Sequence, residues 1–233
     1  MTGLGDCAFE QSHILTGTMY RCEAVSVEGF VQQLAVQYVQ HGHIFYVVGT
    51  IPERKDPRLV DVKLIKRYGI DVSRATRSRR RRADHASVHY LRHGKFFVLI
   101  ATHGKHGFFE EESGILDIRE TPLCYGGYSI SYRRGVDRRW HASVRIAREE
   151  YHVLKRRLVA TAVALPLGEI ADGFWRIRFE PYAPIRRQLF NILRFVNRAR
   201  KASGLERVPI QVIRMRRRVV KPFGGLGVAE KCA

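Results

Sequence analysis

The sequence predicts an α+β fold, with a mixed or mainly antiparallel sheet, packed helices and a basic helical appendix at the C-terminal end. Two pairs of strand-like segments joined by short glycine-containing turns favour antiparallel neighbours. Helical segments flank these strands instead of alternating with them one by one, which disfavours a doubly wound parallel sheet. The chain has 233 residues, of which 45% are hydrophobic, so it can form a packed core.

The first third of the chain is expected to form a helix, a strand and a second helix. Apolar side chains occupy one broad face of residues 27–40, which indicates a helix. Residues 43–51 are apolar on both faces, as is typical of a central strand. A short amphipathic helix is expected over residues 58–68, and the arginine-rich segment 74–82 is expected to be a loop.

Six further strands and another helix are expected before residue 165. The strands are predicted at residues 87–92, 95–102, 116–120, 123–125, 128–133 and 140–146. Glycine-containing turns join the first two and the last two of these strands into hairpins. The most hydrophobic of the six, 95–102, should be a second central strand. A helix over 148–164 follows, and it begins with two glutamates, which the helix dipole favours at that end.

The last part of the chain is rich in basic residues and is expected to be largely helical. Residues 185–202 carry one continuous apolar stripe at helical spacing. Residues 210–220 are expected to be extended, so that Arg214, Arg216 and Arg218 point the same way. We therefore divide the chain into an irregular leader (1–22), an α+β core domain (23–165), a basic helical C-terminal region (166–223) and a disordered tail (224–233).

The positive charge of the chain is unevenly distributed. The net charge is +19, and residues 1–70 contribute nothing to it, because they hold seven basic and seven acidic side chains. Residues 71–233 hold 34 basic and 15 acidic side chains. Six arginines fall within 74–82, and residues 186–221 contain twelve basic side chains and one acid, Glu206. This segregated surplus indicates a polyanionic partner, of which nucleic acid is the first candidate.

The hairpin predicted over 128–146 places arginines beside aromatic side chains. A two-stranded ribbon fits the major groove of DNA, arginine pairs with guanine edges, and aromatic side chains stack on unpaired bases. The alternative is a solvated hairpin whose aromatic side chains pack across the strands. Taking the hairpin with the basic segments, the residues expected to contact nucleic acid are Arg74, Arg77, Arg79, Arg80, Arg81, Arg82, Arg133, Arg134, Arg138, Arg139, Trp140, Arg187, Arg194, Arg198, Lys201, Arg214, Arg216 and Arg218.

Two histidine pairs are candidates for a metal site. His103 and His106 follow the most hydrophobic strand, and Glu110 comes shortly after them. A divalent ion held by these three side chains could activate a water molecule or a phosphodiester. The alternative is a polar loop with two surface histidines. His41 and His43 stand at alternate positions before the first strand and could share one ion, or His41 could simply mark a helix end.

Tyr151 is a candidate nucleophile, because Lys155 follows one helical turn later and its ammonium group would favour the phenolate. A tyrosine on a late helix together with a histidine pair is similar to the arrangement in rolling-circle initiators and related transposases. Those proteins carry a His-hydrophobic-His pair on a central strand, whereas neither histidine pair of this chain has a single hydrophobic residue between its members. The resemblance implies metal-dependent nicking of DNA. The alternative is that Tyr151 lies at the edge of the core.

The leading hypothesis is a cytoplasmic protein that binds DNA or RNA through its arginines and requires no cofactor for binding. The alternatives are a metal-dependent tyrosine DNA-nicking enzyme of a plasmid or mobile element, and a structural RNA-binding component of a ribonucleoprotein. The chain shows no signal-peptide pattern, no C-x-x-C spacing and no apolar run of about 18 residues, so we expect reduced thiols and no membrane association. Phosphate-binding loops and hydrolase or zincin motifs are missing, which disfavours those enzyme classes.

Overall fold

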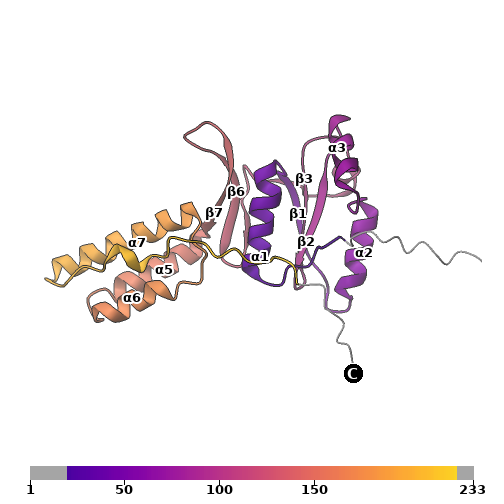
Figure 1. Ribbon diagram of the computed structural model, residues 1–233. Helices are drawn as coiled ribbons and strands as arrows, with labels where there is room; N and C mark the ends of the chain where they lie inside the picture. Colours follow the sequence, from indigo (N-terminus) through magenta and orange to yellow (C-terminus); the bar gives the residue numbers. More distant parts are fainter. Residues whose placement is uncertain (1–19, 225–233) are drawn as a thin grey trace, which may run out of the picture.

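The computed structural model describes residues 20–224, and it contains two antiparallel sheets with helices packed on them (Figure 1). The fold is therefore α+β, as the hairpin-like strand pairs predicted. Most of the predicted leader and almost all of the predicted tail lie outside the described residues. No helix within residues 20–224 combines the length and the apolar character needed to cross a bilayer.

The larger sheet has four strands in the order β2-β3-β1-β4. Its strands are β1 (Phe45–Thr50), β2 (Val88–His93), β3 (Phe96–Ala101) and β4 (Leu116–Asp117). The two strands predicted to be central are confirmed in that position, because β3 pairs with β2 and β1, and β1 pairs with β3 and β4. Apolar side chains on both faces of these strands fit a sheet that is covered on both sides.

The smaller sheet has three strands in the order β5-β6-β7. Its strands are β5 (Leu123–Tyr125), β6 (Tyr128–Arg134) and β7 (Trp140–Ile146). Gly126 and Gly127 join β5 to β6 with φ angles of 56° and 82°, a left-handed conformation that glycine adopts without strain. The β6–β7 pair forms the predicted hairpin, with Arg134 opposite Trp140 at its far end.

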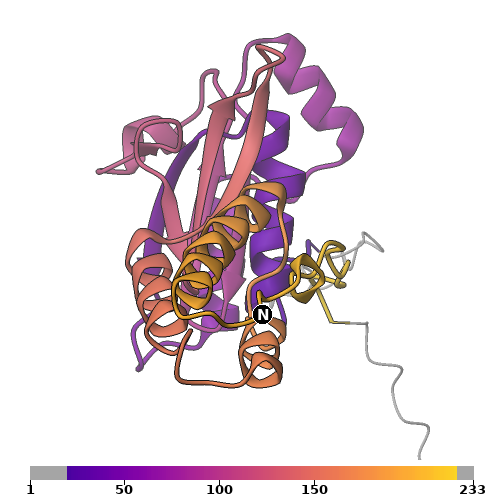
Figure 2. The same ribbon diagram turned by 90° about the vertical axis from the view of Figure 1, so that its left-hand side faces the viewer.

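Helices cover the larger sheet on both faces and continue into a C-terminal bundle (Figures 1 and 2). The helices are α1 (Val27–Gln32), which continues as the π-helical turn η1 (Gln33–Tyr38) and the short η2 (Val39–His41), then α2 (Pro57–Arg67), α3 (Arg74–Arg82), α4 (Phe108–Glu111), α5 (Arg148–Ala160), α6 (Leu167–Trp175), α7 (Ala183–Ala202) and η3 (Ile210–Val212). Phe30 and Leu34 of the first helix pack on Leu91 and the inner face of the sheet. Tyr68, after α2, packs on the opposite face.

The C-terminal helices share one hydrophobic core with the sheets. Leu158 on α5, Ile170 on α6 and Ile192 on α7 belong to the same buried cluster as the strands. The side chain of Gln188 on α7 exchanges two hydrogen bonds with the backbone of Ile146 on β7, at 2.8 and 3.1 Å. The separate basic appendix is therefore not confirmed, because α6 and α7 are packed into the body of the protein.

Three local predictions need correction. The segment 74–82 forms helix α3 instead of a loop, because Ser73 caps it and arginine is a good helix former. Helix α6 was not predicted as an individual element, and it starts directly after Pro166, since the fixed φ of proline suits the beginning of a helix. Residues 210–220 contain only η3 and no strand, so their arginines do not alternate along a sheet edge.

A buried ion pair fastens α2 to the larger sheet. Asp61 on α2 accepts hydrogen bonds from Nε and Nη2 of Arg92 on β2, both at 2.8 Å, and from the hydroxyl of Tyr90 at 2.6 Å. Asp61 is 7% exposed and Arg92 is 2% exposed. Arg92 also contacts Glu23 at 3.1 Å, which draws the start of the described chain onto the same strand. Loss of one partner would leave the other charge buried without compensation.

We expect Asp61→Asn to lower the free energy of unfolding by about 3–5 kcal/mol, because Arg92 would remain buried without an anion. Urea denaturation at pH 7 measures the change. Glu53→Gln is the matched control, since Glu53 pairs with Lys95 at the surface and should cost less than about 1 kcal/mol. Equal losses in the two variants would contradict a special role for the buried pair.

Candidate nucleic-acid interface

Helix α3 carries six arginines, four of them in its last turn. Ser73 begins the helix by accepting a hydrogen bond from the backbone of Thr76 at 3.1 Å, and the negative end of the helix dipole favours the cations at the other end. Arg77 is half-buried, and its guanidinium lies 3.5 Å from the carbonyl oxygen of Ile70. The other arginines of α3 are Arg74, Arg79, Arg80, Arg81 and Arg82, all exposed.

No arginine of α3 forms an ion pair with any carboxylate of residues 20–224. The recorded side-chain bonds of this group go to two backbone carbonyls, those of Ile70 and Gly69. Like charges one helical turn apart destabilise a helix by a few tenths of a kcal/mol per pair. Helix α3 is therefore a dense, uncompensated cationic surface.

The tip of the β6–β7 hairpin is a second cationic surface. Arg133, Arg134, Arg138 and Arg139 are exposed there, and none of them has a carboxylate partner among the described residues. Asp137 lies between them, but its carboxylate binds His141 at 2.8 Å and the backbone of Arg139 at 3.1 Å. The single acid of the tip thus holds the turn and forms no ion pair with the four guanidinium groups.

Two aromatic side chains lie beside these arginines. Trp140 is 42% exposed and stacks on Tyr132, with ring centroids 5.3 Å apart and an angle of 23° between the rings. The guanidinium carbon of Arg119 lies 5.9 Å from the centre of the Trp140 ring. The predicted neighbourhood of aromatic and basic side chains is present, although Tyr132 and Trp140 also pack against each other, as the alternative expected.

Helix α3 and the hairpin tip project toward the same end of the molecule, which can be followed in both views (Figures 1 and 2). Helix α7 extends from the foot of the hairpin toward the other side of the molecule. Its residues Arg187, Arg194, Arg198 and Lys201 are exposed and have no ion-pair partner within residues 20–224. The structure therefore brings two of the three predicted basic elements to one end, while the third, α7, points away from that end.

The C-terminal arginines behave differently from one another. Arg214 points inward, because its Nη2 donates to the carbonyl of Ile177 at 2.7 Å and its Nη1 lies 4.0 Å from a carboxylate oxygen of Glu180. Arg214 thus serves the packing of the chain, in contrast to the exposed Arg216 and Arg218. The three do not form the aligned row that an extended strand would give.

The predicted metal residues do not come together as a ligand set. His103 and Glu110 are exposed, and His106 accepts a hydrogen bond from the backbone of Phe108 at Nδ1, at 3.0 Å. The ring of His103 instead packs edge-on against Phe45, with centroids 4.7 Å apart. Throughout the described part of the chain, no three His, Cys, Asp or Glu side chains are arranged to hold a metal ion.

The two predicted catalytic residues are engaged with other partners. The hydroxyl of Tyr151 on α5 accepts a hydrogen bond from Nδ2 of Asn191 on α7, at 2.7 Å. The ammonium group of Lys155 lies 3.4 Å from the centre of the Phe195 ring. Tyr151 is partly buried and packs against the main core, which is the position that the alternative interpretation expected.

Two histidines, the buried His43 and the half-buried His89, lie in contact near Arg77 and Arg81 of α3, and only His43 was singled out from the sequence. His43 is 3% exposed, and its ring centroid lies 4.9 Å from that of His89 on β2. Tyr38 stacks on His89 at 4.6 Å, and the hydroxyl of Tyr20 lies 3.1 Å from its Nδ1. His41 does not join this cluster as a metal partner; it ends η2. Because successive side chains of β2 point to opposite faces of the sheet, the strand pattern could have placed His89 on the inner face.

Burial lowers the pKa of both histidines. The pKa of His43 falls to about 4, and the positive charges of Arg81 and Arg77 add to the effect of desolvation. The pKa of His89 falls to about 3 by burial and by its neighbour His43. Nδ1 of His43 bonds the carbonyl of Tyr38 at 3.0 Å, while its Nε2 is buried without a hydrogen-bond partner among the described residues. Both rings are therefore neutral at pH 7.

We expect the free energy of unfolding to fall as the pH is lowered from 7 to 5. The unfolded histidines take up protons near pH 6.5, whereas the buried ones do not, so the stabilisation is complete above that pH and decreases below it. His43 alone should account for up to about 3 kcal/mol by pH 4. Urea denaturation across this pH range measures the slope.

His43→Phe should flatten this slope, whatever its effect on stability at pH 7. His152→Phe is the control, because His152 is exposed on α5 and should leave the slope unchanged. A wild-type protein of constant stability between pH 7 and 5 would contradict the assignment of neutral, buried histidines.

Comparison of the chain with protein-family models, with curated proteins and with solved structures found no significant match in any of the three. The assignment of a function thus rests on the residues themselves. The strongest feature they offer is the cationic end formed by α3 and the hairpin tip.

Proposed function

We propose that the protein binds nucleic acid and that α3 and the tip of the β6–β7 hairpin are its main contacts with the phosphate backbone. The observation that carries the proposal is the gathering of ten exposed or half-buried arginines at one end of the molecule without a carboxylate partner in the described chain. Exposed Arg216 and Arg218 and the arginines of α7 extend the positive surface beyond this end. Binding of this kind requires no cofactor.

The choice of arginine over lysine supports a phosphate ligand. A guanidinium group offers parallel N–H donors that match two phosphate oxygens, whereas an ammonium group acts as a point charge. Helix α3 contains six arginines and no lysine. A surface that served only solubility would gain nothing from this geometry.

Repulsion among the arginines of α3 also supports a polyanionic ligand. Ser73 and the helix dipole stabilise the two ends of the helix, but no acid of residues 20–224 offsets the charges between them. A polyanion would remove the repulsion, and the release of its counterions would favour the complex further. The helix is therefore best stabilised when a polyanion is bound.

The hairpin adds a means of contacting bases. Trp140 and Tyr132 form a stacked pair next to Arg133 and Arg134, and aromatic rings beside arginines suit contact with unpaired bases. Arginines at the tip of a two-stranded ribbon also suit the major groove of a duplex. The hairpin supports both DNA and RNA as ligands, so a structural role in a ribonucleoprotein is an outcome of the experiments below.

The contacts of Tyr151 with Asn191 and of Lys155 with Phe195 do not favour a nicking reaction.

We expect the affinity for nucleic acid to fall steeply with salt. If at least four to five phosphates are neutralised, a plot of the logarithm of the association constant against the logarithm of salt concentration should have a slope of about −4 for duplex DNA. Fluorescence anisotropy between 50 and 300 mM potassium chloride, roughly the range in which such slopes are measured, provides the data. A slope near zero would remove the proposal.

Competition of RNA against DNA in the same assay identifies a ribonucleoprotein component by a preference for RNA.

We expect the double variant Arg79→Gln, Arg82→Gln to lower the magnitude of the salt slope by about 2, because each lost phosphate contact contributes about 0.9. Glutamine keeps the helix propensity of α3 nearly unchanged. The control is Arg176→Gln, Arg178→Gln, which removes the same charge from two exposed arginines that pair with Asp172 and Glu150. Equal effects of the two double variants would show that net charge matters and that α3 is no contact site.

A further inference from the structure

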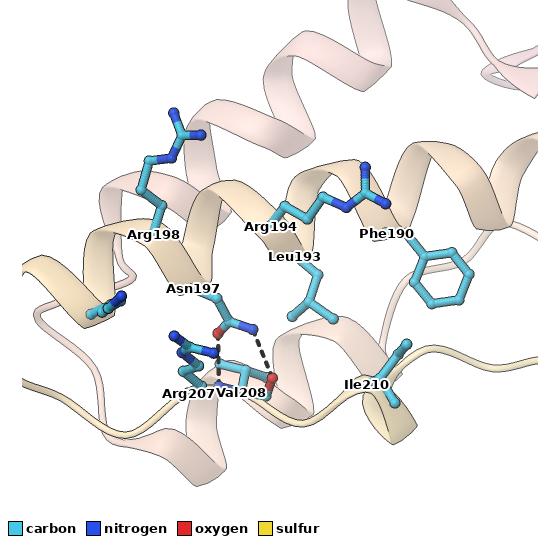
Figure 3. Close-up of a pocket in the computed structure, with 9 residues that line it drawn as sticks. Phe190, Leu193, Arg194, Asn197, Arg198, Arg207, Val208 and Ile210 are labelled. Atoms are coloured by element: carbon cyan, nitrogen blue, oxygen red, sulfur yellow. Dashed lines mark hydrogen bonds between the residues drawn. The ribbon is translucent and has the colours of Figure 1, made fainter.

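A groove runs along α7, away from the end that carries α3. It lies between this helix and the segment that returns beside it, residues 205–213, which we call the return segment. The groove has a volume of about 680 Å³ (Figure 3). This volume is in the range that accommodates one small organic group such as a nucleotide.

The return segment is fixed in place by side chains of α7. The amide of Asn197 donates to the carbonyl of Val208 at 2.9 Å and accepts from its backbone N–H at 2.8 Å, as a neighbouring strand would (Figure 3). Nε of the buried Arg200 donates to the carbonyl of Glu206 at 2.6 Å. The groove is therefore a built feature of the fold, with two walls that are bonded to each other.

The floor and the open side of the groove differ in character. Leu193 and Val208 are buried and form an apolar floor. Phe190 stands at one end, near Ile210, which is 53% exposed although it is a large apolar residue (Figure 3). These side chains give a flat, apolar group a surface to pack against.

The rim of the groove is positive. The cations that line it are Arg194, Arg198, Lys201 and Arg207. No carboxylate lines the groove, and none of the four forms an ion pair with a described residue. Arg207 belongs to the return segment, whereas Arg194 and Arg198 leave α7 on the side away from that segment in Figure 3. An apolar floor under a cationic rim suits a ligand that joins a flat apolar group to an anion.

We propose that this groove holds one nucleotide of a single-stranded nucleic acid, with the base against Phe190 and Ile210 and the adjacent phosphates on the arginines of the rim. The inference rests on the proposed function and specifies part of its ligand. A duplex presents a closed stack to such a groove, whereas a single strand can turn a base out of the stack and place it on an aromatic ring. An apolar peptide would bring no charge to offset the rim, and a second copy of this chain would bring a net charge of +19.

The test compares binding of fluorescent oligo-dT of twelve nucleotides with a duplex of the same length, by anisotropy over a range of salt. Phe190→Leu retains an apolar side chain and removes the ring, and it should weaken single-strand binding about tenfold while changing duplex binding less than about twofold. Arg194→Gln should lower the magnitude of the single-strand salt slope by about 0.7, the value for one phosphate contact. Arg156→Gln is the charge-matched control, because Arg156 is exposed on α5 and does not line the groove.

The outcomes distinguish a failure of the groove from a failure of the nucleic-acid interface. Wild-type binding to both ligands, with Phe190→Leu and Arg194→Gln no different from Arg156→Gln, would overturn the groove and leave the nucleic-acid interface standing. Equal weakening of both ligands by Phe190→Leu would also overturn it, because the ring would then act through stability. Circular dichroism of the variants confirms their folding. No binding of either ligand by the wild-type protein would overturn the proposed function and the groove together.

Discussion

The buried pair of Asp61 and Arg92 is the interaction on which the position of the arginine helix depends. It holds α2 against β2, and α3 follows α2 after a short connection. Within this connection Tyr68 and Ile70 are almost fully buried, so the chain leaves α2 in one direction only. Without a fixed α2, the six arginines of α3 would repel one another with no fixed orientation toward the rest of the surface. The buried pair of Asp61 and Arg92 thus determines where the unpaired arginines of α3 lie on the surface.

Elsewhere in the described chain, too, acidic side chains stabilise the fold while clustered arginines have no acidic partner. The described carboxylates that form ion pairs mostly hold structure together: Asp61 holds Arg92, Asp117 holds Arg119, and Asp137 holds a turn through His141. Glu180 receives the backbone N–H of Arg218 at 2.8 Å and lies near Arg214. None of these acids forms an ion pair with an arginine of α3, of the hairpin tip or of the rim of the groove. The positive surplus behind the net charge of +19 therefore lies where the arginines are clustered.

The sequence predicted what depends on local periodicity and missed what depends on contacts between distant segments. Continuous apolar runs indicated both central strands, and glycine-containing turns indicated both hairpins, since these signals are visible in a single segment. The segment 74–82 was expected to be a loop, yet the Ser73 cap and the helix propensity of arginine make it a helix. The predicted arginines of α3 and of the hairpin tip are exposed, apart from the half-buried Arg77, whereas Arg214 binds backbone carbonyls. The groove could not be foreseen, because it depends on Asn197 and Arg200 meeting the return segment.

The groove and the hairpin tip are held in fixed positions by one shared hydrophobic core. Helix α7 is tied to β7 through Gln188, and β7 is one arm of the hairpin whose tip carries the arginines, so the groove and the hairpin are parts of one packed unit. The cationic groups are thus carried on elements that are ordered before a ligand arrives, and fewer backbone degrees of freedom are lost on binding than in a flexible basic tail. A strand of nucleic acid that engages two such places gains from their fixed spacing, since the second contact becomes intramolecular once the first is made. Under the proposed function, the packed core would therefore contribute to affinity as well as to stability.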